Sequence, residues 1–137
     1  MNHNGPEEKT IGELELIHAF SGPMPAGVSV SHGGRMFVNF PRWDRDEDVT
    51  TTVVELHNGD EVSFPTAAWN QPASKDDPTA FVSVQSIVVD PADRLWVLDT
   101  GRPEFERARA GGPKLVGIDL TTDTVFRTIT FRPGGGA

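Results

Sequence analysis

The 137-residue sequence contains no cysteine and no tyrosine, and only 12 Lys and Arg residues stand against 20 Asp and Glu residues. Without cysteine, disulfides, thiol nucleophiles and thiolate metal sites are excluded. The formal net charge of −8 argues against nucleic acid and anionic membranes as partners, because both attract basic surfaces. No hydrophobic run approaches the ~18 apolar residues that a membrane-spanning helix needs. The composition therefore indicates a globular domain that binds neither nucleic acid nor membrane.

Several catalytic signatures are also missing. The four histidines are scattered without a His-x-His or His-Glu-x-x-His pair, and Gly-x-Ser-x-Gly does not occur. The acidic residues of 44–48 imitate the start of a calcium-binding EF-hand loop, but Val49 occupies the position that needs glycine. We therefore expect neither a metal nor another cofactor.

The two ends of the chain are polar or glycine-rich. Residues 1–9 predict a disordered lead-in, and residues 132–137, which end in Gly-Gly-Gly-Ala, predict a flexible tail. The first ten residues lack the apolar segment of a secretory signal peptide. A cytoplasmic location is therefore the expectation from this sequence.

The strongest strand pattern lies at residues 86–99. Two runs of mostly β-branched and large apolar residues are joined by Pro-Ala-Asp, which is typical of a hairpin of buried strands. Pro91 fixes φ for the turn and cannot donate a hydrogen bond to a continuing strand. The carboxylate of Asp90 is expected to accept hydrogen bonds from turn amides. Trp96 is expected to pack on a face of the sheet.

The same pattern occurs 59 residues earlier, so that Val28 aligns with Ile87 and Arg35 with Arg94. A second hairpin follows each copy. In the first copy this hairpin turns at Asn58-Gly59, a pair that tolerates positive φ. Four strands per repeat at this period predict an all-β fold made of β-propeller blades.

Several ordered motifs resemble the family of major royal jelly and insect yellow proteins, most closely its bacterial members, which are often labelled dopachrome-tautomerase-related. The motifs are Met24-Pro-Ala-Gly-Val-Ser-Val-Ser, Arg35-Met-Phe-Val-Asn-Phe-Pro-Arg-Trp43, Ala68-Trp-Asn70, Phe81-Val-Ser-Val-Gln-Ser86, Arg94-Leu-Trp-Val-Leu-Asp-Thr-Gly-Arg102 and Pro113-Lys-Leu-Val-Gly-Ile-Asp-Leu120. The resemblance covers about residues 12–131. It implies a six-bladed β-propeller, with functions that differ between members of the family.

The chain is long enough for part of such a ring. We assign residues 10–131 to a partial propeller, with blade one at residues 27–64 and blade two at residues 82–131. By the resemblance, residues 10–20 form a strand that would complete the last blade. Six blades of roughly 50 residues need about 300 residues, so the ring is incomplete. Either this is the N-terminal portion of a longer protein, or copies self-associate through the open blade face.

Ligands of propellers bind near the mouth of the central channel, and six residues are candidates for contacting one. They are Gln85, Asp99, Arg102, Trp43, Trp69 and Asn70. Gln85 either contacts a ligand or satisfies buried backbone groups between blades. Asp99 either accepts a substrate amine or caps the turn after its strand. The two tryptophans either wall a pocket for amines or aromatic compounds or pack between blades.

Two functions remain open. The first is binding of a small molecule, an amine or an aromatic compound, at the channel mouth, as in some yellow-related proteins. The alternative is part of a tautomerase- or lactonase-type propeller enzyme whose remaining catalytic residues lie in blades that are missing here. An enzyme needs an acid–base pair or a metal in the channel, and no residue of this sequence is assigned a catalytic role. The expected partners are a small-molecule ligand and further blades.

Overall fold

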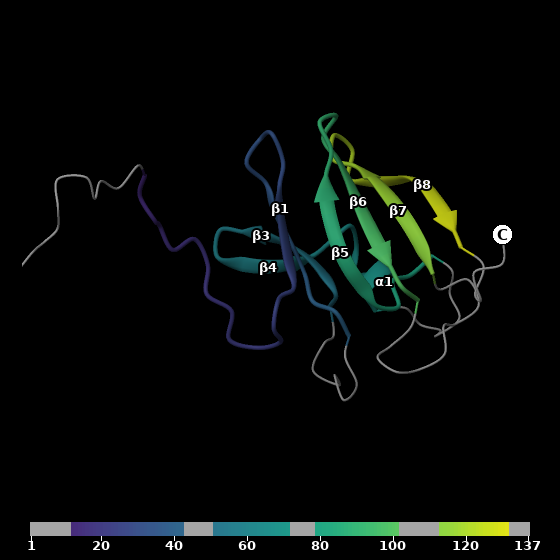
Figure 1. Ribbon diagram of the computed structural model, residues 1–137, viewed down its shortest axis with the longest axis horizontal. Coiled ribbons are helices and arrows are strands. Elements are labelled where there is room, and N and C mark those ends of the chain that lie inside the picture. The colour runs from purple at the N-terminus through teal and green to yellow at the C-terminus, as the bar shows by residue number, and fades with distance from the viewer. Residues whose placement is uncertain (1–11, 43–50, 72–78, 102–112, 132–137) are drawn as a thin grey trace, which may run out of the picture.

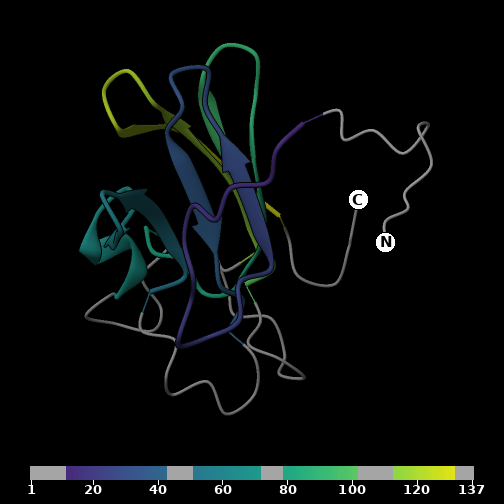
Figure 2. The same cartoon turned by 90° about the vertical axis from the view of Figure 1, so that its left-hand side faces the viewer.

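The computed structural model describes residues 12–42, 51–71, 79–101 and 113–131. They form two four-stranded antiparallel sheets in which the strands follow sequence order. Sheet A contains β1 (Gly27–Val30), β2 (Met36–Asn39), β3 (Val53–His57) and β4 (Asp60–Ser63). Sheet B contains β5 (Val84–Val89), β6 (Arg94–Asp99), β7 (Lys114–Asp119) and β8 (Thr124–Thr130). The sheets lie side by side, with β5 against β1 and β2 (Figures 1 and 2).

This architecture confirms the predicted all-β fold of two blades without a closed ring. β1 and β2 occupy the repeat positions of β5 and β6, as the alignment of Val28 with Ile87 requires. The turn between β3 and β4 has the predicted positive φ angles, 52° at Asn58 and 88° at Gly59. In the β5–β6 turn, Asp90 Oδ1 accepts hydrogen bonds from the main-chain N–H groups of Ala92 and Arg94.

The core lies between the two sheets. Because side chains alternate across a strand, each sheet turns one apolar set toward the other sheet. The buried members of this core are Phe37, Val53, Phe64, Phe81, Val84, Leu95, Val97, Val116, Ile118 and Leu120. At roughly 1.5–3 kcal/mol for each large apolar side chain removed from water, this contact is the main source of stability for the pair of sheets.

Arg35 joins the two sheets across the edge of this core. Its guanidinium donates to both carboxylate oxygens of Glu55, at 2.8 and 3.0 Å, within sheet A. It also reaches sheet B, where it donates to the carbonyl oxygen of Leu120 at 2.8 Å and lies 2.9 Å from Oδ1 of Asp123. The hydrogen bond with Glu55 outweighs desolvation and, with help from Asp123, raises the pKa of the Arg35 guanidinium above its ordinary value. The ion pairs therefore fix sheet A to the β7–β8 turn of sheet B.

The connection between the sheets contains a feature that the sequence analysis did not predict. It holds a short helix, α1 (Ala67–Asn70), which begins after Thr66 because the hydroxyl oxygen of Thr66 accepts a hydrogen bond from the N–H of Trp69 at 3.2 Å. Among the described residues, no helix is long and apolar enough to cross a bilayer.

The N-terminal segment also differs from a simple strand. Residues 12–20 form no strand in the described part of the chain and instead lie across the face of sheet A that is remote from sheet B (Figure 1). A strand at residues 10–20 that completes a last blade needs a partner outside this chain, so it stays a prediction. The predicted lead-in at residues 1–9 and tail at residues 132–137 lie outside the described residues.

Gly117 in β7 gives a test of packing on the other face of sheet B. A Cβ atom there would lie 2.8 Å from the rings of both Trp96 and Phe126. These two rings pack edge to face, with their centroids 5.4 Å apart. We expect Gly117→Ala to lower the free energy of unfolding by about 1–3 kcal/mol through overpacking, measured by urea denaturation. Gly22→Ala, where a Cβ meets nothing within 4 Å, is the control and should change it by less than about 0.5 kcal/mol. Equal effects of the two substitutions would contradict this packing.

Candidate functional site

Gln85 and Asp99 lie at the same end of sheet B, where β5 begins and β6 ends. Val84 pairs with Asp99, and the register then shifts before Ser86 pairs with Leu98, so Gln85 stands in a β-bulge. The Gln85 side chain is exposed, whereas Val84 beside it is fully buried. Gln85 therefore does not satisfy buried groups between the blades. A bulge re-aims a side chain, and bulges are frequent beside functional sites.

Asp99 is buried, and its carboxylate is committed to the protein. Oδ1 accepts hydrogen bonds from the main-chain N–H groups of Ser83 and Gly101, at 2.9 and 2.8 Å. Oδ2 accepts a hydrogen bond from the N–H of Val82 at 2.8 Å and lies 3.4 Å from the ammonium of Lys114, which is also fully buried. Asp99 thus caps the end of β6 and fixes the start of the loop that follows it.

Asn70, at the end of α1, is fully buried and organises sheet A. Its side-chain oxygen accepts hydrogen bonds from the N–H groups of Thr52 and Val53, at 3.0 and 2.8 Å. Its side-chain nitrogen donates to the carbonyl oxygens of Phe64 and Thr66, both at 3.0 Å. These contacts use the full hydrogen-bonding capacity of an amide. Contrary to the sequence-based expectation of a ligand contact, Asn70 holds the strand ends together.

The remaining candidates divide between the core and the undescribed part of the chain. Trp69 packs on Phe81 with ring centroids 5.0 Å apart and joins the core between the sheets, as one of the two interpretations predicted. Trp43 and Arg102 lie outside the described residues. The structure therefore brings Gln85 and Asp99 to one end of sheet B, with Gln85 exposed and Asp99 buried.

Asn39 was missed by the sequence analysis, although an asparagine within the apolar run of residues 36–40 was a signal. It ends β2, is fully buried and donates from its side-chain nitrogen to the carbonyl oxygen of Val84 at 3.2 Å. Among the described residues its Oδ1 has no hydrogen-bond partner. Because buried polar atoms normally have one, this oxygen is an acceptor beside the start of β5.

The opposite end of the sheets carries a shallow hollow of about 300 Å³ between the β1–β2 and β5–β6 turns. Its lining includes His32 and Asp90, and the N–H of His32 donates to the carboxylate of Asp93 at 2.9 Å. No group of three or more His, Asp or Glu residues forms a metal-sized cluster in the described parts of the chain. This end thus offers a polar rim that includes the carboxylates of Asp90 and Asp93.

Asp90 is held ionised by its neighbours. Partial desolvation alone would raise its pKa, but the indole N–H of Trp96, 2.8 Å from Oδ2, and hydrogen bonds from Arg94 and the Ala92 N–H outweigh that effect. Together they lower the pKa of Asp90 to about 2. The β5–β6 turn therefore depends on a carboxylate rather than a carboxylic acid.

For Asn70, the isosteric change Asn70→Asp keeps the acceptor and places a second oxygen against the carbonyls of Phe64 and Thr66. At pH 7 we expect a loss of about 3 kcal/mol or more in the free energy of unfolding, because a buried charge then faces acceptors. Burial among carbonyls raises the folded-state pKa above the unfolded value. The deficit relative to wild type should therefore shrink as the pH falls from 7 toward about 4 and be smallest below about pH 4, where the introduced carboxyl group would be protonated in both the folded and the unfolded state.

Urea denaturation between pH 3 and pH 8 measures this deficit. The matched control is Asn58→Asp, the same substitution in the exposed β3–β4 turn, where φ is 52°. Aspartate tolerates that conformation, so the control should stay near wild type. A deficit for Asn70→Asp that does not depend on pH would contradict the assigned contacts.

The lowered pKa of Asp90 leads to a second prediction about how stability depends on pH. Its folded-state pKa lies below the ordinary value of 3.8, so its contribution to stability is complete above that value and is lost as the pH falls toward 2. We expect Asp90→Asn to be less stable than wild type at pH 7 and the difference to narrow between pH 4 and pH 2. Asp60→Asn in the exposed start of β4 is the matched control. A gap for Asp90→Asn that is constant across this range would be the contrary result.

Comparison with known proteins identifies the relatives of this chain. Residues 82–134 match the family described as "Major royal jelly protein". "Protein yellow" of Drosophila melanogaster is 33% identical over 109 residues, which cover 76% of this chain and 20% of that protein. The same protein of Drosophila pseudoobscura pseudoobscura is 32% identical over 109 residues, with 76% and 19% covered. The chain thus spans about a fifth of the length of the curated relatives it matches, and it belongs to the major royal jelly and yellow protein family.

Proposed function

We propose that this chain supplies part of the wall of a small-molecule site at the channel mouth of a yellow-like propeller, for an amine or an aromatic compound. The observation that carries the proposal is the position of Gln85. It is exposed in a bulge of β5, which lies against β1 and β2. An amide can accept a hydrogen bond from an ammonium group and donate one to a hydroxyl.

The surroundings of Gln85 support a fixed rather than a flexible contact. Asp99, which lies in the strand paired with β5, is buried and hydrogen-bonded to three main-chain N–H groups and faces Lys114. On the side of sheet A, Asn39 ties β2 to β5 through the carbonyl oxygen of Val84. The residues around the bulge are therefore held by buried polar contacts, and such a supporting shell is what a preorganised binding residue requires.

Binding of phenethylamine, followed by saturation-transfer NMR, tests the proposal. We expect Gln85→Leu to weaken binding and Gln85→Glu to strengthen it roughly fivefold, because a carboxylate near a partly solvated cation gains about 1 kcal/mol. Benzyl alcohol, which carries no charge, should show no gain with Gln85→Glu.

Gln71→Leu and Gln71→Glu are the matched controls, because Gln71 is also exposed but follows α1. Neither control should change the affinity. Equal affinities for phenethylamine in wild type and both Gln85 variants would refute the proposed contact.

A further inference from the structure

The two sheets of this chain contact each other with opposite faces. We call the side of a sheet that carries Arg35 and Phe37 in sheet A, and Arg94 and Trp96 in sheet B, the arginine face. The aliphatic face is the other side, which carries Val28, Val30, Met36, Val38, Val54 and Leu56 in sheet A and Ile87, Val89, Leu95, Val97, Val116 and Ile118 in sheet B. The strand registers place each set on one side of its sheet.

In the contact between the sheets, the arginine face of sheet A lies on the aliphatic face of sheet B. The repeat aligns Arg35 with Arg94 and Val38 with Val97, so the contact joins two different faces of the same kind of unit. Such a contact is heterologous, because it joins two different surfaces. A stack of sheets built from this contact always has one uncovered arginine face at one end and one uncovered aliphatic face at the other. Here those ends are the arginine face of sheet B and the aliphatic face of sheet A.

The arginine face of sheet B is built like the one already in use. In sheet A, the guanidinium carbon of Arg35 lies 5.3 Å from the ring centroid of Phe37 and 5.6 Å from that of Phe64. In sheet B, Arg94 lies 5.8 Å from the ring centroid of Trp96 and 5.7 Å from that of Phe126. The cation stacked over two rings is therefore repeated, but in sheet B no other described sheet covers it.

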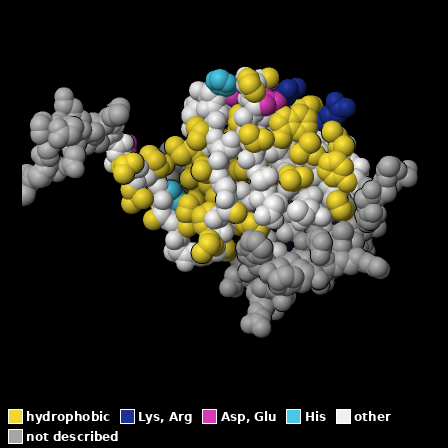
Figure 3. Space-filling view, viewed as in Figure 1, with side chains coloured by type: hydrophobic (Ala, Val, Ile, Leu, Met, Phe, Trp, Pro, Cys, Tyr) yellow, Lys and Arg dark blue, Asp and Glu magenta, His cyan; other side chains and the backbone are white. Residues whose placement is uncertain are grey.

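Both end faces carry apolar side chains that are exposed to solvent. On the arginine face of sheet B, Val88 is 56% exposed and Leu98 is 38% exposed. On the aliphatic face of sheet A, Val28 is 63% exposed and Val30 is 52% exposed. Figure 3 shows hydrophobic side chains gathered over sheet B, with basic side chains along the upper rim. Apolar faces rimmed by polar groups are typical of protein interaction sites.

The charges at the rims of the two end faces are complementary. In the internal contact, Arg35 reaches Asp123 in the β7–β8 turn of the sheet that offers its aliphatic face. The corresponding turn of sheet A, between β3 and β4, is followed by Asp60. Arg94 donates from its Nε to Asp90 at 2.7 Å, and within the described residues its terminal amino groups donate no hydrogen bond. A second arginine–carboxylate contact is therefore available between Arg94 of one copy and Asp60 of another.

We propose that the aliphatic face of sheet A of a second copy of this chain docks on the arginine face of sheet B, head to tail, and repeats the internal contact.

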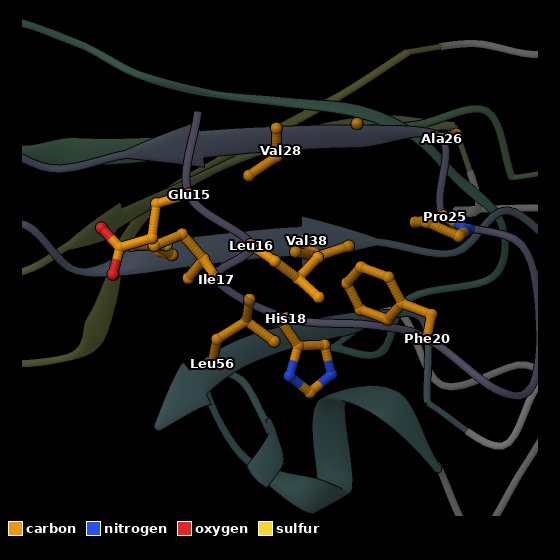
Figure 4. A pocket seen from close by; sticks show the side chains of 12 residues that line it. Glu15, Leu16, Ile17, His18, Phe20, Pro25, Ala26, Val28, Val38 and Leu56 are labelled. Carbon is orange, nitrogen blue, oxygen red and sulfur yellow. The ribbon is translucent and has the colours of Figure 1, made fainter. Parts of the chain in front are cut away.

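One segment of the chain competes for the aliphatic face. Residues 15–20 cross it and leave a groove of about 450 Å³, in which Leu16 and Phe20 point toward Val38 (Figure 4). The segment is held by the contact of His18 with Glu61 at 2.9 Å, yet Leu16 stays 83% exposed. Val38 and Val54 are each only 2% exposed, so docking of a second copy requires residues 15–20 to leave this face.

Light scattering of the purified chain at rising concentration tests the proposal. Wild type should exceed the monomer mass, whereas Val88→Glu and Val28→Glu, one on each end face, should each be monomeric. Val62→Glu is the matched control, because Val62 is 50% exposed on the outermost strand of sheet A and lies on neither end face. It should keep the wild-type mass. Circular dichroism confirms that each variant is folded.

Mixing the two monomeric variants separates head-to-tail docking from other modes. Each variant keeps one intact end face, so an equimolar mixture should form a dimer with one copy of each and no larger species. A dimer formed by Val28→Glu alone would mean that arginine faces pair with each other, and it would overturn the proposal. A wild-type chain that stays monomeric at its highest soluble concentration would overturn it as well.

Discussion

The packing of the arginine face of sheet A on the aliphatic face of sheet B is the interaction on which the described structure depends. A four-stranded sheet of this size cannot bury both of its faces by itself, and both sheets contribute residues to the shared core. Arg35 adds direction to this contact, because its guanidinium satisfies Glu55 in its own sheet and Leu120 and Asp123 in the next. Apolar burial provides most of the stabilisation. Arg35 fixes the orientation of the contact, because it holds sheet A against the β7–β8 turn of sheet B.

Buried polar groups secure the ends of the strands around this core. Asn70 closes the start of β3 and the end of β4 through four main-chain contacts, and Asp99 closes the end of β6 through three. From the sequence, both residues were candidates for contacting a ligand. In the folded chain their polar atoms are committed to the backbone, because an unpaired buried amide or carboxylate is costly. Gln85, in contrast, is exposed in a bulge.

The sequence predicted the parts of this fold that follow from local rules. The period of two within the strands, the turn at Asn58-Gly59 and the repeat that aligns Arg35 with Arg94 are local patterns, and all three appear as expected. The role of Asn70 was not predictable, because its partners lie up to 18 residues away and become known only when α1 folds against sheet A. The bulge at Gln85 likewise depends on the register between β5 and β6, which single-residue preferences do not specify.

The order of strands in each sheet has a consequence for how the chain folds. Every strand pairs with its neighbour in sequence, so each sheet grows through short loop closures that cost little entropy. The contacts between sheets are more distant, since Arg35 and Leu120 are 85 residues apart. Proteins with mainly local pairings fold faster than those that must first close long loops. We therefore expect the hairpins within each sheet to form before the distant contacts between the two sheets, which complete the core.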